Sequence, residues 1–266
     1  MCWGAVDCRV KGQEPKVQLA SAIAVSNLRP RLSSWPHEVL AGQFQIHSTV
    51  PVGRLQPYLP KIASLPTELM QSLCISVADQ PIHIVVLENR ESLDSYVQRL
   101  LPSAPSRRAL YIRHRGPGLV LTYFNASWLT DARHECIHAV LDANHVKVPQ
   151  WLDEGLAEYF ETATNPLLHA THSVAVQSQN RYGQIPDLEQ MERLPSTAEM
   201  SPKDYRDAWG MVAFLLNSSP RAQSALQMYL QDLQNDRAAG FLSHRLKPMV
   251  HSWRDEFTGF FRKQPI

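Results

Sequence analysis

The sequence lacks any long hydrophobic run. No segment approaches the ~20 consecutive apolar residues that a membrane-spanning helix requires. Residues 19–25 are apolar and small and follow Lys11 and Lys16, which is the outline of an export signal. This stretch is too short, and too far from the first residue, to predict a signal peptide. The sequence therefore predicts no transmembrane segment and leaves both export and the compartment open.

An excess of either charge is also absent, and cysteines are few. The 26 Lys and Arg residues are balanced by 25 Asp and Glu residues, so net charge gives no reason to expect nucleic acid or an anionic membrane as a partner. The four cysteines form no CxxC pair, which argues against a zinc knuckle and a disulfide framework. Pairing of Cys2 with Cys8 stays open. Cys136 is expected to be an apolar filler.

The chain is long enough for one large domain or two closely packed lobes, since 44% of its 266 residues are hydrophobic. Its first half carries strand-like patterns, and its second half carries helical ones. This order predicts an α+β fold with no internal repeat, in which the strands form a mixed sheet. We expect a poorly ordered lead-in, a strand-rich lobe, and one unit containing the metal-site helices and a helical C-terminal lobe, at residues 1–40, 41–126 and 127–266.

The individual elements are predicted from hydrophobic spacing and from breaks at proline and glycine. Predicted strands cover 43–48, 82–87, 109–112 and 119–124. Predicted helices begin after Pro66, at 91, near 127, at 150, at Pro202, at Pro220 and at His251. Residues 163–200 are expected to be less regular.

One helix carries the sequence His134-Glu135-Cys-Ile-His138. Its two histidines are four residues apart, so they project from the same helical face one turn apart and can bind one metal ion. Glu135 lies where it can act on a water beside that metal. The competing interpretation is a pair of partly buried histidines on a core helix.

A catalytic zinc site needs a third protein ligand. Glu154 fits geometrically, because it lies about four residues into the second helix and His138 lies about five residues from the end of the first. At ~1.5 Å per residue, both are roughly 6–8 Å from the shared loop. His145 is a weaker candidate.

Two further features of the second helix fit this arrangement. Glu158 is one turn beyond Glu154, opposite His134, where its carboxylate can accept a hydrogen bond from the ring nitrogen that does not bind metal. A solvated charge is the alternative for Glu158. The small residues Gly155 and Ala157 are expected to let this helix approach the first one closely.

These residues together resemble a known family. The His-Glu-x-x-His sequence, followed by the Trp-Leu-x-Glu-Gly-Leu-Ala-Glu-Tyr run from Trp151 to Tyr159, is similar to the gluzincin metallopeptidases of the peptidase MA-like superfamily, and most of all to uncharacterised bacterial domains. The resemblance covers about residues 131–160 and implies one Zn²⁺ ion, with Glu154 as third ligand. The chain departs from the best-known members in the gap between His138 and Glu154, which is shorter here.

The resemblance also implies two further features. Tyr205, at the start of a later helix, matches in placement a tyrosine that stabilises the tetrahedral intermediate, although the lysine and glycine that follow it in the family are missing. The strand at 119–124 corresponds to one that pairs with an extended substrate. A helix-start tyrosine packed on the core is the alternative for Tyr205.

The predicted activity is zinc-dependent hydrolysis of a peptide or protein substrate, in which Glu135 takes a proton from a metal-activated water. Two alternatives remain: an inactive zincin-like domain that binds metal or a partner, and a zinc hydrolase of another amide or ester. The sequence predicts neither the substrate preference, nor endo- or exopeptidase action, nor the oligomeric state.

Overall fold

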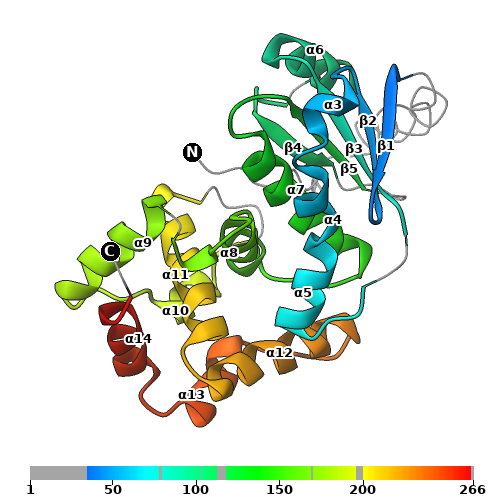
Figure 1. The fold of residues 1–266 in the computed structure, drawn as a ribbon. Helices are drawn as coiled ribbons and strands as arrows, with labels where there is room; N and C mark the ends of the chain where they lie inside the picture. Colours follow the sequence, from blue (N-terminus) through cyan, green and yellow to red (C-terminus); the bar gives the residue numbers. More distant parts are fainter. Residues whose placement is uncertain are drawn as a thin grey trace. The chain divides into compact units, whose positions relative to one another are not determined.

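The computed structural model describes residues 35–77, 80–102, 104–112, 118–168, 170–195 and 200–264. A five-stranded mixed sheet is followed by a mostly helical C-terminal part, so the α+β prediction is confirmed (Figure 1). By internal contacts the chain divides into two compact units. The sheet unit contains the described residues up to 66 and those from 80 to 143, and the helical unit contains 67–77 and the described residues from 144 onward.

The sheet unit is built on strands in the order β1-β2-β3-β5-β4. The strands are β1 (His37–Ala41), β2 (Phe44–Ser48), β3 (Ile82–Leu87), β4 (Ala109–Ile112) and β5 (Leu119–Tyr123). The three inner strands are parallel, whereas each edge strand is antiparallel to its neighbour. The four predicted strands are therefore confirmed.

β1 lies inside the stretch that the sequence predicted as a poorly ordered lead-in. It forms a hairpin with β2 through Gly42, whose φ of +60° suits a residue without Cβ. Its side chains are half-buried at best until Ala41, as expected at a sheet edge, so the hydrophobic pattern was too weak to detect. The rest of the predicted lead-in, residues 1–34, lies outside the described residues, and so do Cys2 and Cys8.

Helices cover both faces of the sheet. Helix α6 (Arg90–Leu100) buries Leu93 and Val97 in a cluster with Val85 and Leu121. Alternate residues such as Val120 point to the opposite face, where α7 (Trp128–Ala143) packs against β3, β4 and β5. The short helices α3 (Val52–Leu55) and α4 (Leu59–Ala63) contact β1. The metal-motif helix is thus one of the layers of this unit.

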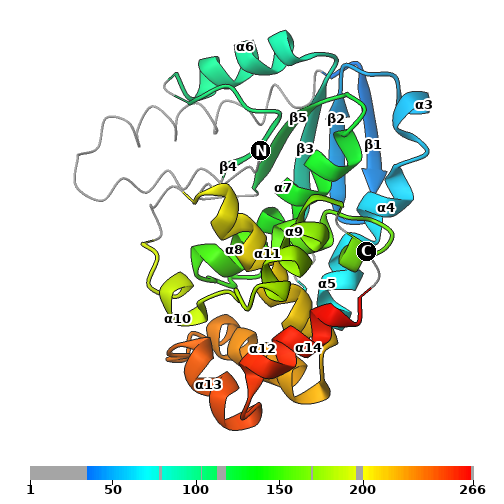
Figure 2. The same ribbon diagram turned by 90° about the vertical axis from the view of Figure 1, so that its left-hand side faces the viewer.

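The helical unit is organised around α11 (Pro202–Asn217). Its other elements are α8 (Gln150–Phe160), the 3₁₀ helix η1 (Pro166–Leu168), α9 (Ala170–Arg181), α10 (Leu188–Met191), α12 (Pro220–Gln234), α13 (Leu242–Met249), α14 (Trp253–Arg262) and most of α5 (Leu65–Leu73). α11 contacts α8, α9, α10, α12 and α14, and it lies beside α8 in both ribbon views (Figures 1 and 2).

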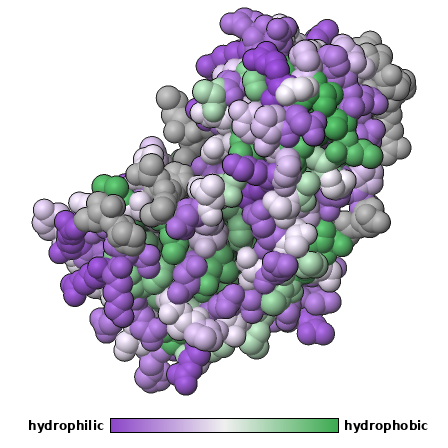
Figure 3. Space-filling model, in the orientation of Figure 1, coloured by the Kyte–Doolittle hydropathy of each residue, from purple (hydrophilic) through white to green (hydrophobic). Residues whose placement is uncertain are grey.

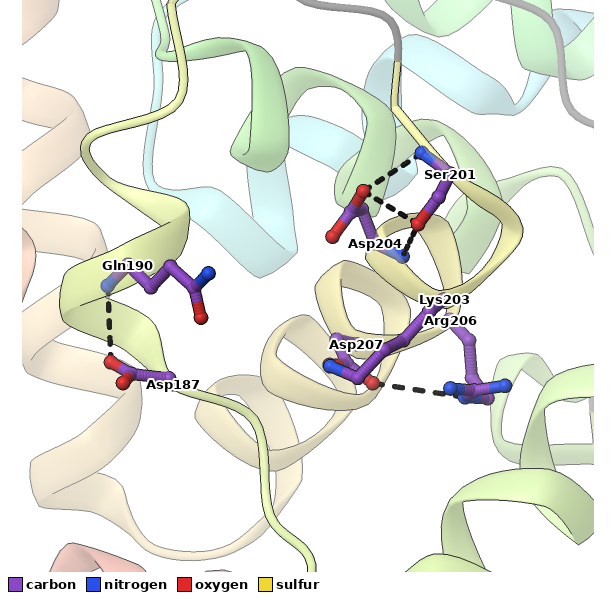
Figure 4. Close-up of polar contacts among 7 residues, drawn as sticks. All are labelled: Asp187, Gln190, Ser201, Lys203, Asp204, Arg206 and Asp207. Atoms are coloured by element: carbon purple, nitrogen blue, oxygen red, sulfur yellow. Dashed lines mark hydrogen bonds and ion pairs between the residues drawn. The ribbon is translucent and has the colours of Figure 1, made fainter.

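The start of α11 is fixed by local polar contacts (Figure 4). Ser201 and Asp204 form a reciprocal capping box, in which the Asp204 carboxylate accepts the Ser201 N–H at 2.8 Å. One turn later, the buried carboxylate of Asp207 pairs with Lys203 and with the Nε of Arg206, the latter at 3.7 Å. These contacts define the first turn of the helix that carries Tyr205.

α9 lies where the sequence predicted an irregular stretch, so that part of the prediction was wrong. Its inward-facing side chains are largely polar: His172, Ser173, Gln177 and Asn180 are all buried. A helix that buries polar groups shows little hydrophobic periodicity, although those groups still need partners. Asn180, for example, donates its Nδ2 hydrogen to the main-chain oxygen of Thr258 on α14 at 2.9 Å.

None of the helices in the described part of the chain combines the length and apolar character that a bilayer span needs. Hydrophilic side chains cover most of the face drawn in Figure 3, and apolar ones lie in smaller groups between them.

Gly155 allows the close approach of α8 to α11. A Cβ at this position would lie 2.8 Å from the main-chain oxygen of Ala208 and 3.0 Å from Cγ2 of Val212. The sequence assigned this small residue to an approach between α8 and the motif helix, but the neighbour that needs the space is α11. The nearest atom belongs to the backbone of Ala208, which cannot move aside as the end of a flexible side chain can.

Gly155→Ala is therefore expected to destabilise the protein. Overpacking lowers the free energy of unfolding by about 1–3 kcal/mol. The better helix propensity of alanine raises it by up to ~1 kcal/mol. Urea unfolding should show a lower midpoint for this variant. The control is Gly259→Ala on α14, where a Cβ meets nothing within 4 Å and the midpoint should stay equal or rise. Equal midpoints for the two variants would contradict the packing argument.

Candidate metal centre

The motif residues lie on a helix that is buried along most of its length. His134, Glu135 and His138 are each no more than 1% exposed, and α7 is continuous through all three. The two imidazole rings are neighbours on that helix, with centroids 5.1 Å apart and planes at 74°. The predicted i, i+4 pair of histidines is present.

Glu154 of α8 joins these two histidines. One ligand atom from each of His134, His138 and Glu154 lies within 4.8 Å of the other two, and all three residues are buried. Ligand atoms ~2.1 Å from a tetrahedral metal lie ~3.4 Å apart, so the arrangement can close on one ion with small side-chain adjustments. Two imidazoles and a carboxylate are also suitable donors for zinc.

The weaker candidate, His145, stands apart. It is exposed and has a φ of +58° in the loop between α7 and α8. Among the described residues, no group of potential ligands includes it. The structure thus brings Glu154, rather than His145, to the two motif histidines.

A second group of potential ligands overlaps the first through His134. It consists of His134, Glu158 and Glu161, again with one atom of each within 4.8 Å of the others. We favour the first group as the metal site, because it contains both motif histidines and because Glu158 already binds His172. Glu158 is buried, so the alternative of a solvated charge is wrong. Its hydrogen bond to His134 stays a prediction.

Glu135 is held by the edge of the sheet. Its Oε2 accepts a hydrogen bond from the main-chain N–H of Tyr111 at 2.7 Å. The hydroxyl of the same tyrosine donates to Oδ2 of Asp142, two turns further along α7, also at 2.7 Å. Tyr111 is fully buried, so β4 fixes the carboxylate of the motif. No sequence pattern indicates this contact, because the donor is a backbone group.

The strand expected to pair with substrate was assigned wrongly. β5 (Leu119–Tyr123) pairs with β3 on one side and with β4 on the other. Its main-chain groups are therefore used on both sides, and it has no open edge to which a peptide strand could be added. The edge strand beside it is β4.

The two remaining sequence assignments concern Tyr205 and Cys136. Tyr205 lies near the start of α11 and is 9% exposed. Its catalytic role stays a prediction. Cys136 is fully buried, and that burial raises the pKa of its thiol far above the usual range. A thiol held neutral in this way suits the apolar role predicted for Cys136.

Neither the models of known protein families nor the curated proteins give a match to this chain. The chemistry of the site must therefore be inferred from its own residues and geometry.

Proposed function

We propose that the chain is a zinc metallopeptidase of the gluzincin type. The observation that carries this proposal is the buried group of His134, His138 and Glu154, with Glu135 between the two histidines. Three protein ligands leave a fourth position open for a water or a substrate, which is typical of catalytic rather than structural zinc sites. A wholly structural site would also have no use for Glu135.

The roles of the residues follow from their positions. His134, His138 and Glu154 would hold one Zn²⁺ ion. When bound, the ion would act as a Lewis acid that lowers the pKa of a water and polarises a carbonyl. Glu135 accepts the proton of the attacking water and passes it to the leaving amine. The Tyr111 N–H keeps one oxygen of that carboxylate in place. Tyr205 is assigned to the developing oxyanion, to which its phenol would donate a hydrogen bond.

Metal analysis of the purified chain tests the centre. We expect about one zinc per molecule after purification without chelators. A zinc chelator should remove the ion, and added Zn²⁺ should restore it. A folded chain that binds no metal would refute the site, and stoichiometric iron in place of zinc would refute the metal assignment, since two histidines and one carboxylate also suit iron(II).

Peptide-library cleavage, read by mass spectrometry of the new termini, tests the reaction. Zinc-dependent cleavage that stops on chelation and returns with Zn²⁺ supports the peptidase. A zinc-loaded chain that cleaves no peptide but hydrolyses model esters or other amides would assign it to another class of hydrolase. A zinc-loaded chain without any hydrolysis would indicate a binding domain.

A further inference from the structure

A buried histidine outside the motif contacts α8, the helix that carries Glu154. Nε2 of His172, on α9, lies 2.9 Å from Oε2 of Glu158, on α8. The two side chains are 8% and 3% exposed, so water contributes little to this hydrogen bond. Both helices belong to the helical unit. The contact links α9 to a carboxylate near the candidate metal centre.

His172 has a well-defined position. Its ring centroid is 5.9 Å from that of Trp209 on α11, with the two planes at 44°. Trp209 is itself fully buried, and α9 packs against α11. Packing against a fixed aromatic ring limits the rotamers of the imidazole. His172 can therefore hold the Glu158 carboxylate in a defined position.

Glu158 needs to be held in this way because it is close enough to act as a ligand itself. One of its oxygens lies within 4.8 Å of a ring nitrogen of His134 and of an oxygen of Glu161. Without His172, this carboxylate could rotate toward the metal and compete with Glu154. With one oxygen held by His172, Glu158 is better placed to accept a hydrogen bond from His134.

We propose that His172 is a positioning residue of the metal centre, which holds Glu158 so that this carboxylate orients His134 while Glu154 remains the ligand. The proposal deepens the proposed function and rests on its metal site. It assigns to His172 no contact with substrate or metal.

Zinc affinity of the full chain, measured by competition with a chromophoric chelator, tests this role. His172→Ala should weaken zinc binding about 10-fold, at the lower end of the range for groups that act through a ligand. His172→Gln should recover most of the affinity, because its side-chain amide can still donate to Glu158. In the His172→Ala/Glu158→Ala double variant, affinity should be no weaker than in Glu158→Ala alone, since both changes remove the hydrogen bond between these two side chains.

Asn180→Ala is the matched control for general damage to α9. Asn180 is buried on the same helix and binds Thr258 rather than α8. This variant should lower the urea midpoint but leave zinc affinity unchanged. Cobalt(II) spectra give a second measurement: His172→Ala should change the visible bands, whereas Asn180→Ala should not.

Four results would overturn the proposal. They are wild-type zinc affinity in His172→Ala, equal losses of zinc affinity in the alanine and glutamine variants, additive losses in the double variant, and equal losses in His172→Ala and Asn180→Ala. The last of these would show that His172 contributes only to stability. All of these comparisons require a wild-type chain that binds zinc. Failure of the wild type to bind zinc would instead refute the proposed function.

Discussion

Replacing Glu135 by glutamine is expected to lower peptide hydrolysis about 10²–10⁴-fold, the usual contribution of a general base, while one zinc ion stays bound. The glutamine amide has nearly the same shape as the carboxylate, and its oxygen can still accept the Tyr111 N–H that now binds Oε2 of Glu135. What it cannot do is accept a proton from water. Turnover should therefore be lost without loss of the metal or of the fold.

The measurement compares kcat, zinc content and urea midpoint in the wild type, in Glu135→Gln and in Asp142→Asn. Asp142 is the matched control, because it lies on the same helix and accepts a hydrogen bond from the Tyr111 hydroxyl. Its replacement by asparagine also exchanges an acid for an amide. Activity should be close to wild type in Asp142→Asn. Undiminished turnover in Glu135→Gln would remove Glu135 as the base, and loss of zinc would show that it supports the metal instead.

The fold was predictable where the hydrophobic pattern is strong. The runs that became β3, β5, α11 and α12 are strongly apolar or have clear helical spacing, and proline marks the start of both helices. β1 and α9 were missed for a shared reason, since neither shows a regular apolar face. β1 is a half-exposed edge strand, and α9 buries polar residues such as His172 and Asn180.

The candidate site was predictable to the extent that its residues are neighbours in sequence. The i, i+4 spacing of His134 and His138 follows from helix geometry, and Glu154 follows from the short loop between two helices. The contacts that support these residues are not local. The Tyr111 N–H reaches Glu135 from a strand edge, and His172 reaches Glu158 from a helix that the pattern did not reveal.

The partner of Gly155 was misassigned for a related reason. The glycine was correctly interpreted as a point of close helix approach, but the spacing of residues cannot say which helix approaches. The structure identifies the neighbour as Ala208, on the helix that also carries Tyr205. Because α8 carries Glu154, this contact with α11 also helps to set the position of the candidate third ligand.

Replacing Glu154 by alanine is expected to weaken zinc binding by more than the ~10–100-fold that changes around the ligands usually cost. The reason is that two imidazoles alone leave the ion with an incomplete set of protein donors. His145→Ala should keep the wild-type affinity, since His145 is exposed and outside the group.

Chelator competition on the purified variants decides between the possible ligand sets. The second group, which contains Glu158 and Glu161, predicts a different result. If that group held the ion, Glu161→Ala would abolish zinc binding and Glu154→Ala would not. Loss of zinc in His145→Ala would mean that the third ligand lies in the loop after all. We expect zinc binding to be lost in Glu154→Ala and retained in both Glu161→Ala and His145→Ala. The reason is that Glu154 alone of these three residues shares a buried group with both motif histidines.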